Sequence, residues 1–310
     1  MRVIYVQTRI RRKSIQSATF IPFYYFINVA IELQYHIAKR KPKCRDKNMR
    51  VKAGNLQDYL KATTENASFH YETHPDLMGM VLRMDQVFHE EIFADDLVSN
   101  PYAQLLAMNS YSLLLNGVGQ AISGHTVAIF PVLRTALESA CYAFLIAKNE
   151  ELGVVWINRH NSESALQRCR KKLTVKRACE KLSSFSPEMA EYVMAHYDAS
   201  IDYGAHPNQK AILNHLSDIG EVDSNFHGFE LTSVYGENSW HVNYALLVCT
   251  EVGQAVAYLL AASCDNHPLL NDRLEVFADW FADKIQIADE LNGKPIDYPM
   301  NMYSSITALK

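Results

Sequence analysis

The sequence predicts an all-α fold, a single bundle of about seven or eight helices with a nearly fully buried central helix. Residues 129–147 (IFPVLRTALESACYAFLIA) contain two charged residues, Arg134 and Glu138, in an otherwise apolar or small-residue run. Apolar residues recur at helical spacing through most of the chain. No internal repeat and no Pro/Ser-rich linker divides the 310 residues, so one domain is expected.

The segment 129–147 is the expected centre of the bundle. A surface helix would keep a polar face over about half of its circumference, and this one has almost none. Residues 239–264 predict a second largely buried helix, whose small residues would let a neighbour approach closely.

The first 48 residues are assigned as a basic and apolar extension, before a helical domain at 49–296 and a tail at 297–310. A basic flank precedes an apolar run at 18–38, as in a signal sequence or a membrane span. Polar residues at 32, 34 and 36 shorten its apolar part to roughly 14 residues, below the ~20 that a spanning helix needs. A biological start at Met49, a terminal helix or surface anchor, and a true span all stay open.

The other helices follow from periodicity and from end signals. Ser186-Pro187 is a typical helix start, since serine caps a helix and proline suits its first turn. The same helix should end near Gly204, because His206 precedes Pro207 and is pushed toward extended geometry. Residues 217–238 are expected to form a loop with a short strand. The remaining expected helices are 78–93, 101–117 with its end at Asn116-Gly117, about 119–131 with its end at Pro131, 150–158 and 268–291.

The charge of the chain is divided sharply along its length. Residues 1–50 carry 12 bases and two acids, and residues 51–310 carry 18 bases and 32 acids, a net charge of −14. Such a body repels phosphate backbones, which disfavours a general nucleic-acid-binding role. Eight of its bases nevertheless lie in one segment, 159–181, which is either a solvated helix face or the one surface that could meet a phosphate chain.

Several classes of site lack their sequence signals. The chain has no GxSxG, GxxxxGK[ST] or GxGxxG motif, so hydrolase, nucleotide-hydrolysing and dinucleotide-binding functions have no support. His70 and His74 have a ligand-like spacing, but Pro75 follows directly and no Glu-x-x-His repeat occurs. We predict no metal and no cofactor. The six cysteines form no CxxC pair, which favours a reducing, cytoplasmic compartment.

Arg134 and Glu138 are the first candidate site residues. They lie one turn apart and can pair on one side of their helix. A pair buried in an apolar helix needs further hydrogen bonds to be tolerated. It is therefore either a structural pair that fixes helix docking or part of a ligand or catalytic pocket.

His206 is the best single candidate. The spacing of Asp198, Asp202 and His206 would align them on one helical stripe, but Gly204 and Pro207 predict a turn instead. A histidine there can transfer a proton near neutral pH or cap a carbonyl. The catalytic candidates are thus His206, Arg134 and Glu138, and the binding candidates are Asp202, Asn208 and Tyr142.

The run from Arg83 to His89, RMDQVFH, resembles the Arg-x(4–6)-His pattern of the HEPN helical nucleases. That resemblance implies that Arg83 and His89 act on RNA at a dimer cleft, although the family favours a polar residue where Met84 stands. On one helix the two side chains lie about 120° apart. A bend or a partner subunit would have to bring them together.

A second resemblance rests on VLRTALESACYAFLIA and, about 60 residues later, YGAHPN. Together they resemble a group of uncharacterised bacterial all-helical proteins with Arg-x3-Glu on a buried helix and a His-Pro turn. The resemblance implies a helical bundle in a bacterial cytoplasm and carries over to Arg134, Glu138 and His206. A relation to HEPN bundles is left open.

We expect a non-catalytic module that binds a partner or a small ligand, in a stress or defence setting. The alternative is a metal-independent ribonuclease with His206 or His89 as acid/base and an arginine that stabilises phosphate charge. A second alternative is a protein anchored to the inner membrane through 18–38. The partner is unknown and a homodimer is left open; RNA is a partner only of the ribonuclease, and a membrane only if 18–38 is genuine.

Overall fold

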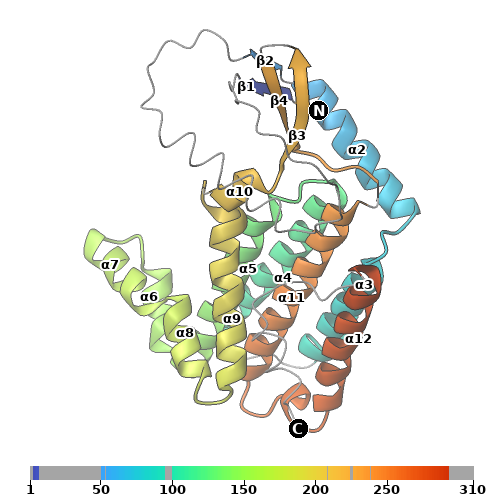
Figure 1. Ribbon diagram of the computed structural model, residues 1–310. Helices are drawn as coiled ribbons and strands as arrows, with labels where there is room; N and C mark the ends of the chain where they lie inside the picture. The colour runs from blue at the N-terminus through green and yellow to red at the C-terminus, as the bar shows by residue number, and fades with distance from the viewer. Residues whose placement is uncertain are drawn as a thin grey trace.

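The computed structural model describes residues 3–6, 50–52, 54–94, 100–207, 209–223, 226–237 and 239–292. The chain forms an all-α bundle with a small antiparallel sheet at one end (Figure 1), which confirms the predicted fold class. The helices are α2 (Leu56–Glu72), α3 (Met78–Val87), α4 (Pro101–Ile122), α5 (Ile129–Lys148), α6 (Glu151–Ile157), α7 (Glu163–Lys172), α8 (Val175–Leu182), α9 (Pro187–Ser200), α10 (Gln209–Leu213), α11 (Trp240–Ser263) and α12 (Leu274–Asn292). Two π-helical turns, η1 (Phe88–Ile92) and η2 (Ile201–Ala205), and a 3-10 turn, η3 (Pro268–Leu270), complete the helical elements.

Helix α11 occupies the centre of the bundle. Every residue from Ala245 to Ser263 is buried, and the helix contacts α3, α4, α5 and α9. Its small residues allow this density of neighbours. A Cβ atom at Gly253 would lie only 2.2 Å from Sδ of Met84 on α3, so the glycine is what lets these two helices approach.

The expectation that 129–147 is buried on nearly all sides was wrong. Helix α5 buries one broad face and keeps a stripe at the surface, where Pro131 and Thr135 are exposed and Arg134 and Glu138 are half-buried. The central position belongs to α11 instead. In the described part of the chain, α5 and α11 are both long and apolar enough to cross a membrane, and 67% and 100% of their most apolar windows are buried inside the protein.

The expected helix end at Asn116-Gly117 was also wrong, because α4 continues to Ile122. Gly117 serves a close contact and not a helix end. A Cβ atom there would lie 2.8 Å from Cδ2 of Leu133, so the glycine lets α4 pack tightly on α5. Ser110 on the same face donates a 2.7 Å hydrogen bond to the carbonyl of Ala136.

The structure has more helices than the seven or eight expected. Helix α2 was not predicted, and the segment after α5 divides into the short helices α6, α7 and α8, which lie together on one side of the bundle (Figure 1). The start of α9 matches its prediction, because Oγ of Ser186 accepts a hydrogen bond from the backbone N–H of Met189. Helix α9 ends at Ser200 and passes into η2.

The segment expected to be a loop forms a β-hairpin. Strands β3 (Leu216–Asp223) and β4 (Phe226–Leu231) pair antiparallel, and β1 (Val3–Val6) and β2 (Arg50–Lys52) extend the sheet in the order β2-β1-β4-β3. Strand β1 lies in the N-terminal extension and pairs with β4. The apolar run 18–38 and the tail 297–310 lie outside the described residues.

Candidate functional site

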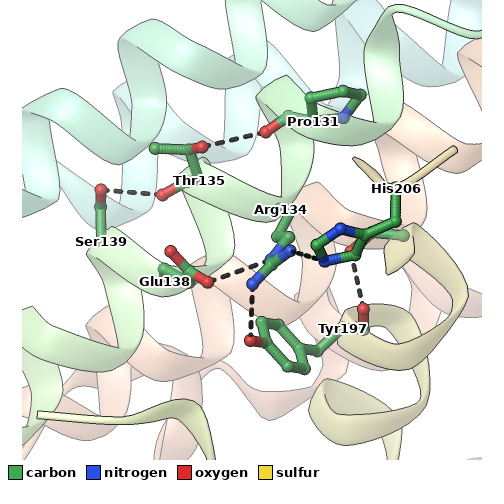
Figure 2. A network of polar contacts seen from close by, with 8 residues as sticks. Pro131, Arg134, Thr135, Glu138, Ser139, Tyr197 and His206 are labelled. Carbon is green, nitrogen blue, oxygen red and sulfur yellow. Dashed lines mark hydrogen bonds and ion pairs between the residues drawn. The ribbon is translucent and has the colours of Figure 1, made fainter. Parts of the chain in front are cut away.

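The candidate site lies where the exposed stripe of α5 meets α9 and η2. Figure 2 shows Arg134 between Glu138, Tyr197 and His206. Its guanidinium donates from Nε to Oε1 of Glu138 at 3.1 Å and from Nη2 to the hydroxyl of Tyr197 at 3.0 Å, and its Nη1 lies 3.1 Å from Nε2 of His206. The three catalytic candidates from the sequence are therefore brought together, although His206 is 72 residues from Arg134.

Local backbone geometry carries His206 to this position. A Cβ atom at Gly204 would lie 2.8 Å from the carbonyl oxygen of Val127 and 3.0 Å from Cβ of Phe130. The absence of a side chain at Gly204 thus lets η2 lie against the start of α5. His206 is extended, with φ −131° and ψ 152°, as its place before Pro207 predicts.

The contact with Arg134 selects one tautomer of the neutral His206 ring. A guanidinium can only donate, so Nε2 of His206 accepts and the ring proton lies on Nδ1. While Arg134 donates to it, Nε2 is not available as a base. Burial lowers the pKa of Arg134, but Tyr197 and Glu138 raise it more, so the net shift is upward and the charge is kept.

The pair of Arg134 and Glu138 is only partly shielded from water. The two side chains are 24% and 29% exposed, so the guanidinium and the carboxylate both remain accessible. Arg134 also lies over the ring of Tyr197, with 5.1 Å between its Cζ and the ring centroid. This is a fixed, charged and reachable group.

The structure describes two of the three binding candidates from the sequence, Tyr142 and Asp202. Tyr142 follows Glu138 by one turn of α5, and burial together with the Glu138 carboxylate raises its pKa to about 12, so its hydroxyl stays protonated. Asp202 is half-buried in η2, directly before the turn that carries His206. Asn208 lies outside the described residues.

Arg83 and His89 do not form a joint site. Arg83 donates to Oε1 of Gln86 at 2.9 Å, whereas His89 contacts the hydroxyl of Tyr111 at 3.1 Å and pairs with Asp85 at 3.7 Å. Within the described residues, no hydrogen bond or ion pair joins Arg83 to His89. His89 lies in the π-helical turn η1, and Tyr111 donates to Asp85 beside it.

Sequence reasoning missed a charged network in the core. Lys284 on α12, 1% exposed, lies 3.3 Å from Oε1 of Glu251 and donates to Oε1 of Gln254 at 2.9 Å. The hydroxyl of Tyr192 on α9 donates to the carbonyl of Glu251 at 3.2 Å. A signal for this network was available, since Glu251 and Gln254 are polar residues within the most apolar helix.

Tyr197 was missed for another reason. Nothing in the spacing of α9 distinguishes it from the other aromatic residues of the chain. Its role depends on the packing of α9 against α5, which places its hydroxyl beside the guanidinium of Arg134.

Among the described residues, no group of three or more His, Cys, Asp or Glu side chains is arranged to hold a metal ion. The five cysteines that the structure describes are free thiols, and four of them are buried. No protein-family model, no curated protein and no solved structure matches this chain.

Proposed function

We propose that the protein is a non-catalytic helical module that binds a polar ligand at the Arg134 cluster, defined as Arg134, Glu138, Tyr197 and His206. The observation that carries the proposal is the state of Arg134, whose guanidinium is held by three side chains while the whole arginine side chain is 24% exposed. A preorganised group of this kind loses little conformational freedom on binding.

The remaining hydrogen-bonding capacity indicates what the site would recognise. Arg134 has five N–H donors, of which three are used within the cluster, so two remain. The carboxylate of Glu138, whose side chain is 29% exposed, keeps acceptor sites beside them. A ligand group that both accepts and donates, such as a carboxamide or an amino acid, would match this surface.

Thermal shift measurements on the full chain test the proposal. The probes are the free amino acids, their amides and small dicarboxylic acids, each against the parent and Arg134→Gln. A ligand present at 100 times its Kd adds about 2.7 kcal/mol, so we expect one class to raise the Tm of the parent by roughly 5 to 10 °C. The shift should be lost in Arg134→Gln and kept in Thr135→Ala, a control on the same exposed stripe. Equal shifts in the parent and in Arg134→Gln would place the binding site elsewhere.

A second candidate function is a metal-independent ribonuclease. The contact between Arg134 and His206 favours it, since a cation beside an imidazole could stabilise phosphate charge while the histidine transfers a proton. It requires that substrate displaces His206 from Arg134, because Nε2 is otherwise engaged. The binding module needs no such rearrangement.

An RNA-cleavage assay in chelator separates the two functions. It uses the full chain beside His206→Ala and His89→Ala, each shown to melt at the parental temperature. We expect no cleavage by any of the three proteins. Cleavage by the parent that is lost in His206→Ala would establish the ribonuclease and overturn the binding module.

A further inference from the structure

A concave surface lies at the end of α5 that is remote from the Arg134 cluster. A cavity of about 440 Å³, open to solvent, is formed where the last turns of α5 meet α6, α7 and α8. Its lining includes Leu145 and Asn149. Asn149 is 15 residues beyond Arg134, which is roughly 22 Å along a helix, so this cavity is separate from the Arg134 cluster.

Three basic side chains line the cavity: Lys172 from the end of α7, and Arg177 and Lys181 from α8. One acid, Glu180, is also in the lining, which leaves a net charge of +2. Leu145 and Leu152 supply apolar surface. The cavity therefore combines a cationic side with an apolar one.

Positive charge is concentrated around this cavity far beyond its lining. Five bases lie within residues 170–177, and the whole segment 159–181 has eight bases and two acids. None of the eight forms an ion pair or a side-chain hydrogen bond with another residue in the part of the chain that the structure describes. The bases of 159–181 are therefore not held in ion pairs with described acidic residues.

The N-terminus of α8 adds to the local positive potential. The first turn of α8 contains Lys176 and Arg177 and no acid, although a helix N-terminus is itself partly positive. The last turn of α7, immediately before it, contains three more bases. Such an arrangement is self-repulsive, and a bound polyanion would relieve the repulsion.

We propose that this cavity is a binding site for a small phosphorylated ligand with two or more negative charges. Lysine and arginine side chains are the usual partners of phosphate groups. None of the described residues that line the cavity is aromatic, whereas single-stranded RNA sites present aromatic rings on which bases stack. A compact phosphorylated molecule thus fits the cavity better than an RNA chain.

Isothermal titration calorimetry on the full chain tests the proposal with inorganic tripolyphosphate and with ATP, both without metal. Arg177→Gln and Lys181→Gln should each weaken the binding of tripolyphosphate about tenfold or more, because each removes a charged hydrogen-bonding group. Arg168→Gln and Lys171→Gln remove the same charge from exposed positions of the same segment outside the lining. These controls should change the affinity by less than about threefold.

Two further arms sharpen the test. Glu180→Gln removes the only acid of the lining and should tighten binding by about twofold or more. ATP that binds more tightly than tripolyphosphate would identify a nucleotide that uses the apolar side, and equal affinities would identify the phosphate chain alone. Either result supports the site.

Three outcomes would overturn the proposal. The first is the absence of binding at 1 mM tripolyphosphate and 50 mM NaCl, and the second is an equal loss of tripolyphosphate affinity in the lining variants and the control variants. The third is binding of a 20-nucleotide RNA that depends equally on all eight bases while tripolyphosphate does not bind. The last two would assign the segment to diffuse electrostatic attraction or to an RNA surface.

Discussion

Helix α9 contacts two ion pairs that lie in very different surroundings. Arg134 and Glu138 face the solvent with side chains 24% and 29% exposed, whereas Lys284 and Glu251 are 1% and 0% exposed. Their N–O distances are similar, 3.1 Å and 3.3 Å. The difference between the two pairs is therefore one of environment and not of geometry.

Adjacent residues of α9 lie near the two pairs. His196 packs its ring against Tyr192 in the core, with 4.4 Å between the ring centroids, and feels the charges of Glu251 and Lys284. Tyr197 accepts a hydrogen bond from Arg134 at the surface. Helix α9 thus contacts both a reachable charged group, suited to a ligand, and a buried one, suited to fixing how α9, α11 and α12 dock.

The largest expected effect comes from breaking the buried pair. Lys284→Met leaves the carboxylate of Glu251 in the core without its cation and should lower the free energy of unfolding by about 3–5 kcal/mol. Urea denaturation of the full chain measures this. The double variant with Glu251→Leu should recover most of the loss, because a buried ion pair is often no more stable than apolar side chains of similar size. A double variant as unstable as the single one would show that this pair is needed for packing itself.

The second effect is a pH dependence that the buried network should show. Burial lowers the pKa of His196 from 6.5 to about 4, so the folded protein keeps this ring neutral. The unfolded chain takes up a proton near pH 6.5, so the stabilisation is complete above that pH and is lost as the pH falls toward 4. The loss is about 1.4 kcal/mol per pH unit, on the order of 3 kcal/mol in total.

His196→Gln provides the comparison for this pH dependence. Removing the titrating ring should make the free energy of unfolding less dependent on pH between 6.5 and 4, by about 1.4 kcal/mol per unit. His206→Gln, at the exposed cluster, serves as the control. If His196→Gln keeps the parental slope, the acid sensitivity has another source.

The third effect concerns how the exposed cluster is built. Gly204→Ala places a methyl group against the Val127 carbonyl and Phe130, and relief of that overlap should cost about 1–2 kcal/mol and move His206 away from Arg134. Gly236→Ala, where a Cβ atom would have nothing within 4 Å, should change stability by less than about 0.5 kcal/mol. The measurements are urea denaturation and the imidazole nitrogen chemical shifts of His206. An unchanged His206 environment in Gly204→Ala would show that the glycine does not position it.

The sequence was enough to predict that α5 and α11 are apolar helices of the core. It was not enough to predict which of the two occupies the centre of the bundle. Periodicity predicted both α5 and α11, but it could not rank their burial. The reason is that Pro131, Arg134, Thr135 and Glu138 form an exposed stripe on α5 only once the neighbours of the helix are known. An arginine and a glutamate in an apolar run drew attention to the Arg134 cluster because the helix was expected to be buried, and that expectation was wrong. They are conspicuous in the sequence and half-exposed in the fold.

The buried pair of Glu251 and Lys284 could not be predicted from the sequence, because only one of its two residues stands out there. Glu251 stands in an even more apolar helix, so the same reasoning would have selected it, but Lys284 has no such signal, since lysine on an amphipathic helix is typical of a surface position. Its burial follows from the packing of α12 against the bundle. The His-Pro signal at 206–207 did predict an extended turn, and only the tertiary structure brings that turn to Arg134.

The smallest expected effect is the contribution of the exposed pair, Arg134 and Glu138, to the free energy of unfolding. A double-mutant cycle of Arg134→Ala and Glu138→Ala should give a coupling energy below about 1 kcal/mol, because water screens both charges. Arg134→Ala alone should cost about 1 kcal/mol, since it also removes the bonds to Tyr197 and His206. A coupling energy comparable to that of Glu251 and Lys284 would mean that the Arg134 cluster is structural. A small coupling energy, together with a lost ligand-induced shift in Tm, would mean that Arg134 is held in place for binding and adds little to the stability of the fold.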